Sequence, residues 1–551
     1  MEKCVLYFYI IIATFYAVSS NELIVNTAYG KIRGVSETAA TGKQVNVWYG
    51  IPYAEKPIGN LRFRPSSLVK PWKNTLDASK IPPACIQTKI RNYDNFPGEE
   101  ILSLSYCGCS TISSKNASVM VWIHGGGFYM GSNSLSFYDH KILATEENVI
   151  VASMQYRLGA FGFLSLEKDI LGNAGFFDQV LALRWIKDNI DAFGGNPDSI
   201  TIFGESAGSG AVSHHLLSPL SSKLFSRGIM QSGVVTSSWA VVPSDINIAR
   251  SLKVVHELGC PDDVKLMVEC LEKADAELII AGQNTIPPKG VVSIPFYPVV
   301  DGTFIVRDPL LTLKSGLYDQ RNVILGSNEH EGHYFLLLYA PRFNYENLTV
   351  TRGRFIEEIP KILPIGTLET EAVIFEYTDW NNPNDVVKNL DALQEMVGDW
   401  YFTCSVYDFA NLYSEKNNVF LYHYKHKNHL HLWPLWAGAM HGDEIVFIFG
   451  EPLNPTKNYK MDQINFSRQM MRYWANFART GNPNCVSFND CQWTWPSFTP
   501  NNPSRINLDI KDFTISNDLR ARKCAFWKEY MPKLKKFSCK YFSLCITFHR
   551  S

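Results

Sequence analysis

The sequence predicts an α/β fold in which helices cover both faces of a large, mostly parallel β-sheet. Short apolar runs of strand type alternate with helix-like segments along the 551 residues. Near-continuous apolar runs are typical of strands buried on both faces, and their alternation with helices is typical of a doubly wound sheet. The expected strands are residues 119–123, 149–153, 199–203, 323–326 and 419–422, and the clearest helix is 179–193.

Composition and charge favour one large globular domain. Hydrophobic residues make up 46% of the chain, and no internal repeat or low-complexity linker is present. The formal net charge is −1, from 52 basic and 53 acidic residues, which gives no reason to expect a nucleic acid or an anionic membrane as a partner. We expect a signal peptide over 1–20, the α/β domain over 21–534 and a basic, aromatic C-terminal tail over 535–551.

The N-terminus predicts a secreted protein. Lys3 precedes an apolar stretch over 5–18, and residues 17–19 are small enough for cleavage. A signal anchor is the alternative, but the stretch is short for a bilayer span, and no later segment has the composition of a transmembrane helix.

Sequons and cysteines also fit secretion, because an oxidising compartment favours disulfides. Asn116, Asn347 and Asn465 begin Asn-x-Ser/Thr sequons and are candidate N-glycosylation sites. The chain has twelve cysteines, and loss of Cys4 with the signal leaves an odd number. One thiol is therefore free or joined to another chain.

A nucleophile motif follows the third expected strand. The pentapeptide Gly-Glu-Ser-Ala-Gly at 204–208 is the only Gly-x-Ser-x-Gly sequence in the chain. It lies between the strand 199–203 and a helix-compatible run that starts near Gly210. A strand, a sharp turn and a helix expose the nucleophilic serine in the α/β-hydrolase fold, whereas the alternative is an ordinary turn with a surface serine. We predict this fold, with Ser206 as nucleophile.

A glycine run follows the first expected strand. The sequence at 124–128 is His-Gly-Gly-Gly-Phe. Acyl transfer needs N–H donors aimed at the oxyanion, and glycines let backbone N–H groups face a ligand without steric hindrance. We predict Gly126, Gly127 and Ala207 as the donors; a flexible glycine loop is the alternative.

Three long motifs resemble the type-B carboxylesterase family and, within it, the cholinesterases. They are Gly-Asn-Ala-Gly-Phe-Phe-Asp-Gln at 172–179, Phe-Gly-Gly-Asn-Pro at 193–197 and Tyr-Trp-Ala-Asn-Phe-Ala-Arg-Thr-Gly-Asn-Pro at 473–483. They occur in the family's order, and the resemblance extends from about residue 27 to 534. It implies ester hydrolysis without a metal or an organic cofactor.

The resemblance also places the acid and the base. α/β-Hydrolases order these residues along the chain as serine, acid and histidine. Glu331 matches the acid and His441 the base, with Glu329 as a rival acid. Glu205 and Ser232 match positions that help to hold the histidine and an ordered water; for Ser232 the alternative is a turn serine.

The remaining histidines near these motifs have simpler interpretations. A cluster lacks an acidic or cysteine companion at ligand spacing, so we expect exposed side chains and no metal site. The cluster consists of His423, His426, His429 and His431. His330 and His333 flank Glu331, and we expect them to face solvent or the pocket rim.

An acyl pocket and an aromatic gorge are further implications of the resemblance. The acyl pocket would contain Trp239, Val292, Ile294 and Phe335, and the gorge Tyr334, Tyr129, Trp433 and Asp94. Acetyl-selective members have phenylalanines where Val292 and Ile294 align, so aliphatic residues predict room for butyryl or larger groups. Aromatic faces bind quaternary ammonium groups through cation–π contacts of about 0.5–2 kcal/mol.

One segment departs from the family. After residue 101 the family continues with a tryptophan, an Asn-Pro turn, Ser-Glu-Asp-Cys and a strand, but residues 102–110 here are mostly Leu, Ser and Cys. The principal choline-binding tryptophan and the partner of Cys85 are missing, and the strand before 119–123 is lost or rebuilt. Two interpretations of 102–117 remain open: divergence, with Cys107 or Cys109 paired to Cys85, or an error in the sequence.

Disulfides also follow from the resemblance, which implies the pairs Cys260–Cys270 and Cys404–Cys524. Cys485 and Cys491 are candidates for an extra local bridge. In the tail, Cys539 or Cys545 is a candidate for joining two chains into a homodimer, and a frayed tail is the alternative.

These features predict a secreted serine esterase that cleaves choline esters such as acetylcholine, or related small esters, through an acyl-enzyme on Ser206. The alternatives are a general carboxylesterase without choline preference and a non-catalytic or slow-turnover binder of esters. The retained triad opposes the binder, and the missing tryptophan favours the general carboxylesterase.

Overall fold

The structure is a computed structural model. It describes residues 23–88, 106–111, 116–339, 349–428, 435–485, 494–511, 513–517 and 519–537. Several predicted features lie outside these residues: the signal peptide, most of the tail, Asp94, Asn347 and Trp433.

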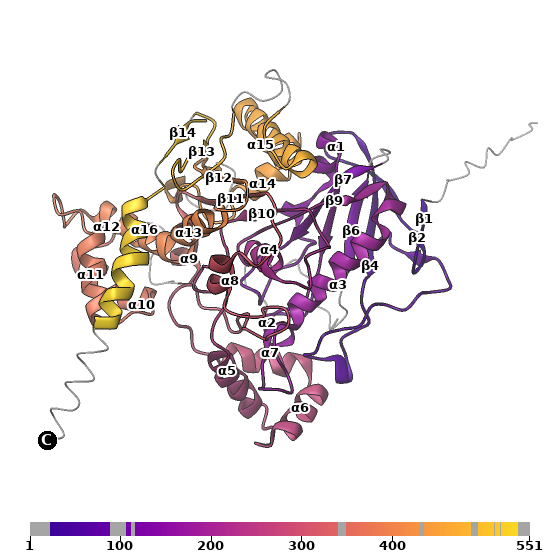
Figure 1. Ribbon diagram of the computed structural model, residues 1–551, viewed down its shortest axis with the longest axis horizontal. Helices are drawn as coiled ribbons and strands as arrows, with labels where there is room; N and C mark the ends of the chain where they lie inside the picture. The colour runs from indigo at the N-terminus through magenta and orange to yellow at the C-terminus, as the bar shows by residue number, and fades with distance from the viewer. Residues whose placement is uncertain are drawn as a thin grey trace, which may run out of the picture.

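An eleven-stranded sheet forms the centre of the protein (Figure 1). Its order is β14-β13-β12-β11-β10-β9-β7-β8-β6-β4-β3, and every neighbouring pair from β13 to β8 is parallel. The strands are β3 (Val35–Thr38), β4 (Gln44–Pro52), β6 (Tyr106–Thr111), β7 (Ala117–Ile123), β8 (Ile150–Met154), β9 (Gly195–Glu205), β10 (Arg227–Gln231), β11 (Val323–Asn328), β12 (Val419–Tyr424), β13 (Arg505–Leu508) and β14 (Ile515–Ser516). A separate small sheet contains β1 (Ile24–Thr27), β2 (Gly30–Arg33) and β5 (Leu76–Asp77).

Helices bury both faces of the sheet. On one face α3 (Ala174–Asn189) and α4 (Ala207–Leu217) pack in the same apolar cluster as Val119, Val121 and Ile123 of β7. On the other face α1 (Lys141–Glu147), α14 (Ile445–Ile448) and α15 (Met461–Thr480) pack with Met120 and Trp122. The alternation within β7 follows from the two-residue period of a strand. It explains why the central strands are apolar throughout, as the sequence predicts.

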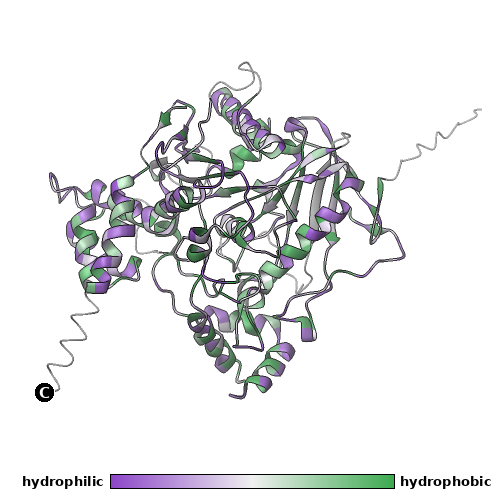
Figure 2. Cartoon of the chain, in the orientation of Figure 1, coloured by the Kyte–Doolittle hydropathy of each residue, from purple (hydrophilic) through white to green (hydrophobic). Residues whose placement is uncertain are grey.

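The other helices lie around this core. They are α2 (Gly159–Phe163), α5 (Ser244–Glu257), α6 (Val264–Lys273), α7 (Ala276–Asn284), α8 (Pro309–Ser315), α9 (Glu331–Tyr339), α10 (Arg352–Ile362), α11 (Thr367–Tyr377), α12 (Val386–Gly398), α13 (Cys404–Tyr413) and α16 (Ala521–Ala525). In Figure 1, α5 and α6 lie at the bottom of the view, and α10, α11, α12 and α16 lie at its left. Helices such as α5, α6 and α15 carry both polar and apolar residues along their length, as Figure 2 shows. No helix in the described part of the chain is long and apolar enough to cross a membrane.

The strands and helix expected from the sequence are present with small shifts at their ends. The structure also contains β6 in the divergent segment, antiparallel to both β4 and β8. A strand is therefore rebuilt there rather than lost. The cysteine pairing considered for this segment is wrong, because Cys85 is a free thiol buried in the core.

Two disulfides connect the peripheral helices. Cys260 and Cys270 form a bond that joins the end of α5 to α6. Cys404 and Cys524 join α13 to α16 over a separation of 120 residues. Cys485 is also disulfide-bonded, and Cys491, its expected partner, lies outside the described residues.

Candidate active site

Four neighbouring strands deliver the predicted site residues to one edge of the sheet. Ser206 follows β9, Ser232 follows β10, Glu331 follows β11, and His441 follows β12. Strands β9 to β12 are adjacent and parallel, so their carboxyl ends meet at the same edge. Ligands of open α/β sheets bind at this edge.

Ser206 occupies a strained turn between β9 and α4. Its φ is +55° and its ψ −122°, and its side chain is half-buried. A Cβ atom on Gly208 would lie 1.9 Å from the carbonyl oxygen of Ile123, and one on Gly204 would lie 2.6 Å from the same oxygen. Both glycines of the pentapeptide are therefore required for the close approach of β9, α4 and β7.

The glycine run lies beside this serine. A Cβ atom on Gly125 would be 3.1 Å from the Cβ atom of Ser206. Gly126 and Gly127 have φ values of +106° and +59°, a conformation that glycine adopts readily. Ala207 begins α4. The three predicted oxyanion donors thus lie on the two backbone segments that meet at Ser206.

Glu331 and His441 form a short, buried contact. The Nδ1 atom of His441 lies 2.6 Å from Oε2 of Glu331, whose side chain is buried. The other carboxylate oxygen accepts hydrogen bonds from the Ser232 hydroxyl at 2.6 Å and from the Asn328 N–H at 2.7 Å. Glu329, the rival acid, is exposed and pairs with Lys425 at 3.7 Å.

The second nitrogen of the histidine faces Glu205. His441 Nε2 and Glu205 Oε1 are 3.0 Å apart, and both side chains are buried. Within the described residues, no hydrogen bond joins the Ser206 hydroxyl to His441. Contacts between a nucleophile and its base often form only in the complex with substrate, so this geometry is compatible with a base role.

Buried carboxylates set the charge of the histidine. Burial lowers the pKa of His441, but Glu205 and Glu331 outweigh this effect and raise it to about 9. Burial raises the pKa of Glu205 to about 8; His441 opposes this shift, and Glu444 and Glu331 reinforce it. Glu205 and His441 are therefore a coupled buried pair, in which the carboxylate of Glu205 favours the protonated imidazole and the imidazole opposes protonation of Glu205.

The sequence does not reveal that two further carboxylates near His441, those of Glu444 and Asp443, are buried. Glu444 accepts hydrogen bonds from Asn328 at 2.6 Å and from Gln231 at 3.1 Å, and burial raises its pKa. Asp443 accepts the Met440 N–H at 2.8 Å, and burial holds its pKa well above the ordinary value. Their position two and three residues after His441 was the available signal, but exposed carboxylates would have given the same sequence pattern.

Two of the predicted acyl-pocket residues, Trp239 and Ile294, lie beside the elbow and the glycine run. A Cβ atom on Gly233 would lie 2.7 Å from the Trp239 ring and 2.8 Å from the Ser206 carbonyl oxygen. Ile294 lies beside Gly127, where a Cβ atom would be 2.8 Å from its Cγ2. Val292 is buried in the same core.

Aromatic rings cover the histidine. Ring centroids of Tyr334, Phe335 and Phe402 lie 5.8, 5.0 and 4.6 Å from that of His441. Phe402 was not predicted, because its place in the sequence does not indicate a neighbour of His441. Tyr129 is half-buried and adjoins the glycine run, 3.0 Å from the Cβ position of Gly127.

The expected exposure is wrong for three histidines, and His429 and His431 lie outside the described residues. His333, His423 and His426 are buried, and His330 is half-buried. His426 pairs with Asp509 at 3.1 Å, and His333 bonds to the carbonyl oxygen of Ala437 at 2.8 Å. These polar partners offset part of the cost of burying the His426 and His333 rings.

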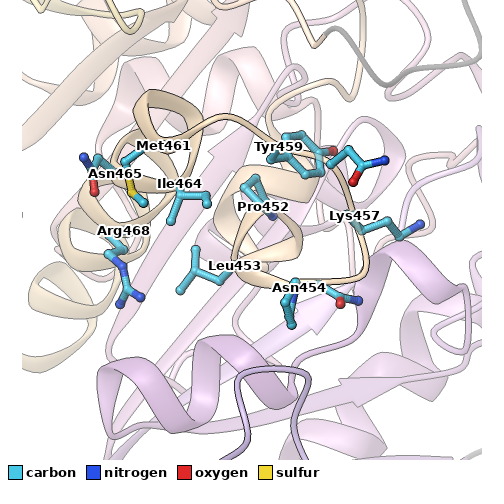
Figure 3. A pocket seen from close by; sticks show the side chains of 11 residues that line it. Pro452, Leu453, Asn454, Lys457, Tyr459, Met461, Ile464, Asn465 and Arg468 are labelled. Carbon is cyan, nitrogen blue, oxygen red and sulfur yellow. The ribbon is translucent and has the colours of Figure 1, made fainter.

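A separate surface pocket lies away from these residues. Its volume is about 490 Å³, and its lining includes Pro452, Lys457, Tyr459, Asn465 and Arg468 (Figure 3). Of the predicted site residues, it contains the sequon residue Asn465 alone.

The elbow serine, the glycine run and the buried carboxylate–histidine pair on this sheet define an α/β-hydrolase. Residues 21–527 match the carboxylesterase family, and the chain belongs to that family. The chain is 41% identical over 532 residues to an acetylcholinesterase of Bungarus fasciatus, covering 94% of this chain and 87% of the relative. Acetylcholinesterases of Danio rerio and Electrophorus electricus are each 38% identical, with 94% and 93% of this chain covered, and 90% and 89% of the relatives. The protein is a carboxylic ester hydrolase of the cholinesterase-like type.

Proposed function

We propose that this protein is a secreted esterase that hydrolyses choline esters through an acyl-enzyme on Ser206. The observation that carries the proposal is the 2.6 Å contact between Glu331 and His441 at the sheet edge that presents Ser206. Choline as the alcohol is supported by the names of the relatives and by the rings around His441.

The residues divide the reaction into two steps. His441 Nε2 takes the proton of the Ser206 hydroxyl as the serine oxygen attacks the ester carbonyl, and it returns that proton to the departing alcohol. A water molecule then attacks the acyl-serine, with His441 taking its proton and returning it to Ser206. Glu331 orients the imidazole, and the N–H groups of Gly126, Gly127 and Ala207 stabilise the oxyanion.

The pocket residues bear on two parts of the substrate, the alcohol and the acyl group. Tyr334 and Phe335 present aromatic faces to a quaternary ammonium group. The aliphatic side chains of Val292 and Ile294 leave room for acyl groups larger than acetyl. The missing tryptophan after residue 101 favours the second candidate, a general carboxylesterase without choline preference.

Kinetics with three thioesters separate these functions. We would measure kcat/KM of the purified protein for acetylthiocholine, butyrylthiocholine and an uncharged thioester of the same shape as acetylthiocholine. A preference for the cationic esters supports the choline-ester function, and equal rates for charged and neutral esters support the general carboxylesterase. Absence of turnover on all three would contradict both and favour an ester-binding protein.

Secretion brings two further proposals. Asn116 and Asn465 are exposed, so N-glycans can extend from both without disturbing the core. In Figure 3, Asn465 lies on the wall of the surface pocket, next to Ile464 and Arg468. Mass spectrometry of peptides from secreted protein, before and after glycosidase treatment, tests both positions.

A tail cysteine that joins two chains would give a dimer on a non-reducing gel that disappears on reduction.

A further inference from the structure

Two additional histidines hold the loop that carries His441. We propose that His330 and His333 are positioning residues, which clamp residues 437–440 onto the segment that carries Glu331. The clamp fixes the position of the imidazole of His441 before substrate binds. This inference rests on the proposed function of His441 as the base.

Each histidine contacts a different residue of the loop. The Nδ1 atom of His330 accepts the N–H of Ala439 at 3.3 Å, and the backbone N–H of His330 donates to the Ala439 carbonyl at 2.9 Å. The Nδ1–H of His333 donates to the Ala437 carbonyl at 2.8 Å. The side chains of His330 and His333, which flank Glu331 in the sequence, therefore bind the backbone on both sides of Gly438.

The loop backbone lies directly on the His330 ring. Gly438 has a φ of +71°, and a Cβ atom there would be 2.3 Å from His330 Nδ1. The two imidazole rings are nearly parallel, at 10°, with centroids 5.8 Å apart. This packing leaves no room for a side chain at position 438 and places the loop backbone directly against the His330 ring.

The two contacts require opposite protonation of Nδ1 in the two rings. His330 must leave Nδ1 unprotonated to accept, whereas His333 must carry its proton on Nδ1 to donate. Burial lowers the pKa of His330, although the neighbouring Glu329, Asp391 and Glu395 oppose the shift, and Lys427 adds to it. Burial, together with His330, lowers the pKa of His333 to about 3. Both rings are therefore neutral near pH 7.

The clamp is continuous with the catalytic contacts. Asn328 donates from Nδ2 to the Met440 carbonyl at 2.6 Å, and Met440 immediately precedes His441. The segment 328–333 thus binds the loop at Ala437, Ala439 and Met440 and binds His441 itself through Glu331. Small displacements of a catalytic group reduce the rate far more than they reduce substrate affinity.

Asparagine and leucine variants test the clamp. The amide of asparagine places an acceptor and a donor near the position of histidine Nδ1, whereas leucine fills a similar volume without a polar atom. We expect His330→Leu and His333→Leu each to lower kcat about tenfold or more while KM changes less than about twofold. His330→Asn and His333→Asn should recover most of the loss. His256→Leu, at an exposed histidine on α5, is the matched control.

A second readout does not depend on turnover. The proton between His441 Nδ1 and Glu331 should give a downfield resonance in the resting protein. It should shift or broaden in the leucine variants and remain in the asparagine variants. The clamp is wrong if folded leucine variants keep both kcat and this resonance, or if the asparagine variants are impaired as much as the leucine variants. If wild-type protein has no esterase activity but the resonance depends on His330 and His333, the clamp stands and the proposed function fails.

Discussion

Glu205 Oε1 lies 3.0 Å from His441 Nε2, the nitrogen that the proposed mechanism requires as base. The same imidazole is bonded to Glu331 through Nδ1. The histidine is thus held between two buried carboxylates. Ser206, the proposed nucleophile, is the residue that follows Glu205.

Replacing Glu205 with glutamine should move the pH dependence of hydrolysis. Glu205 is the largest of the influences that raise the pKa of His441 to about 9. Loss of its charge lowers that pKa, and a base acts only when it is unprotonated, so the acid limb of kcat/KM should move to lower pH. The profile is measured from pH 5 to 10, with Glu257→Gln at an exposed position on α5 as the control. An unchanged acid limb in Glu205→Gln would mean that another group controls it.

Removing the nucleophile should abolish turnover. We expect Ser206→Ala to lower kcat by about 10⁴-fold or more, because the acyl-enzyme can no longer form. The variant should also resist labelling by a fluorophosphonate probe. Ser36→Ala, at an exposed serine on β3, should behave as wild type in both assays. Retained hydrolysis in Ser206→Ala would overturn the assignment of the nucleophile.

The elbow glycine Gly208 should contribute to the stability of the fold. A Cβ atom on Gly208 would lie 1.9 Å from the Ile123 carbonyl oxygen, so Gly208→Ala must displace either α4 or β7. We expect a loss of about 1–3 kcal/mol of unfolding free energy, measured by denaturant titration. Gly353→Ala is the control, because no atom lies within 4 Å of its Cβ position. That substitution in α10 should stabilise the protein by up to about 1 kcal/mol.

Larger side chains in the acyl pocket should select smaller acyl groups. Val292→Phe and Ile294→Phe should lower kcat/KM for butyrylthiocholine relative to acetylthiocholine by about 10-fold or more. Ile356→Phe, at an exposed position on α10, controls for the change of residue type. A parallel loss on both esters would indicate a distorted site, since Ile294 also contacts the glycine run.

Local sequence signals predicted most of this arrangement, and long-range packing accounts for the rest. The elbow was predictable because its strand, glycines and serine are contiguous. The acid and base were placed by the family resemblance. Glu444 could not be assigned in advance, since its partner Asn328 is 116 residues away. The burial of His333 was missed for the same reason, as its carbonyl partner is 104 residues distant.

The spacing of the strands at the sheet edge also sets the distances between residues of the site. Neighbouring parallel strands are about 4.8 Å apart, and β9, β10 and β11 are each followed within three residues by one residue of the site. The lateral spacing of Ser206, Ser232 and Glu331 is therefore built into the hydrogen-bonded framework, whatever the length of the chain between them. Heat should inactivate such a protein only when that framework comes apart, so the temperature at which activity is lost and the temperature at which the core melts should coincide.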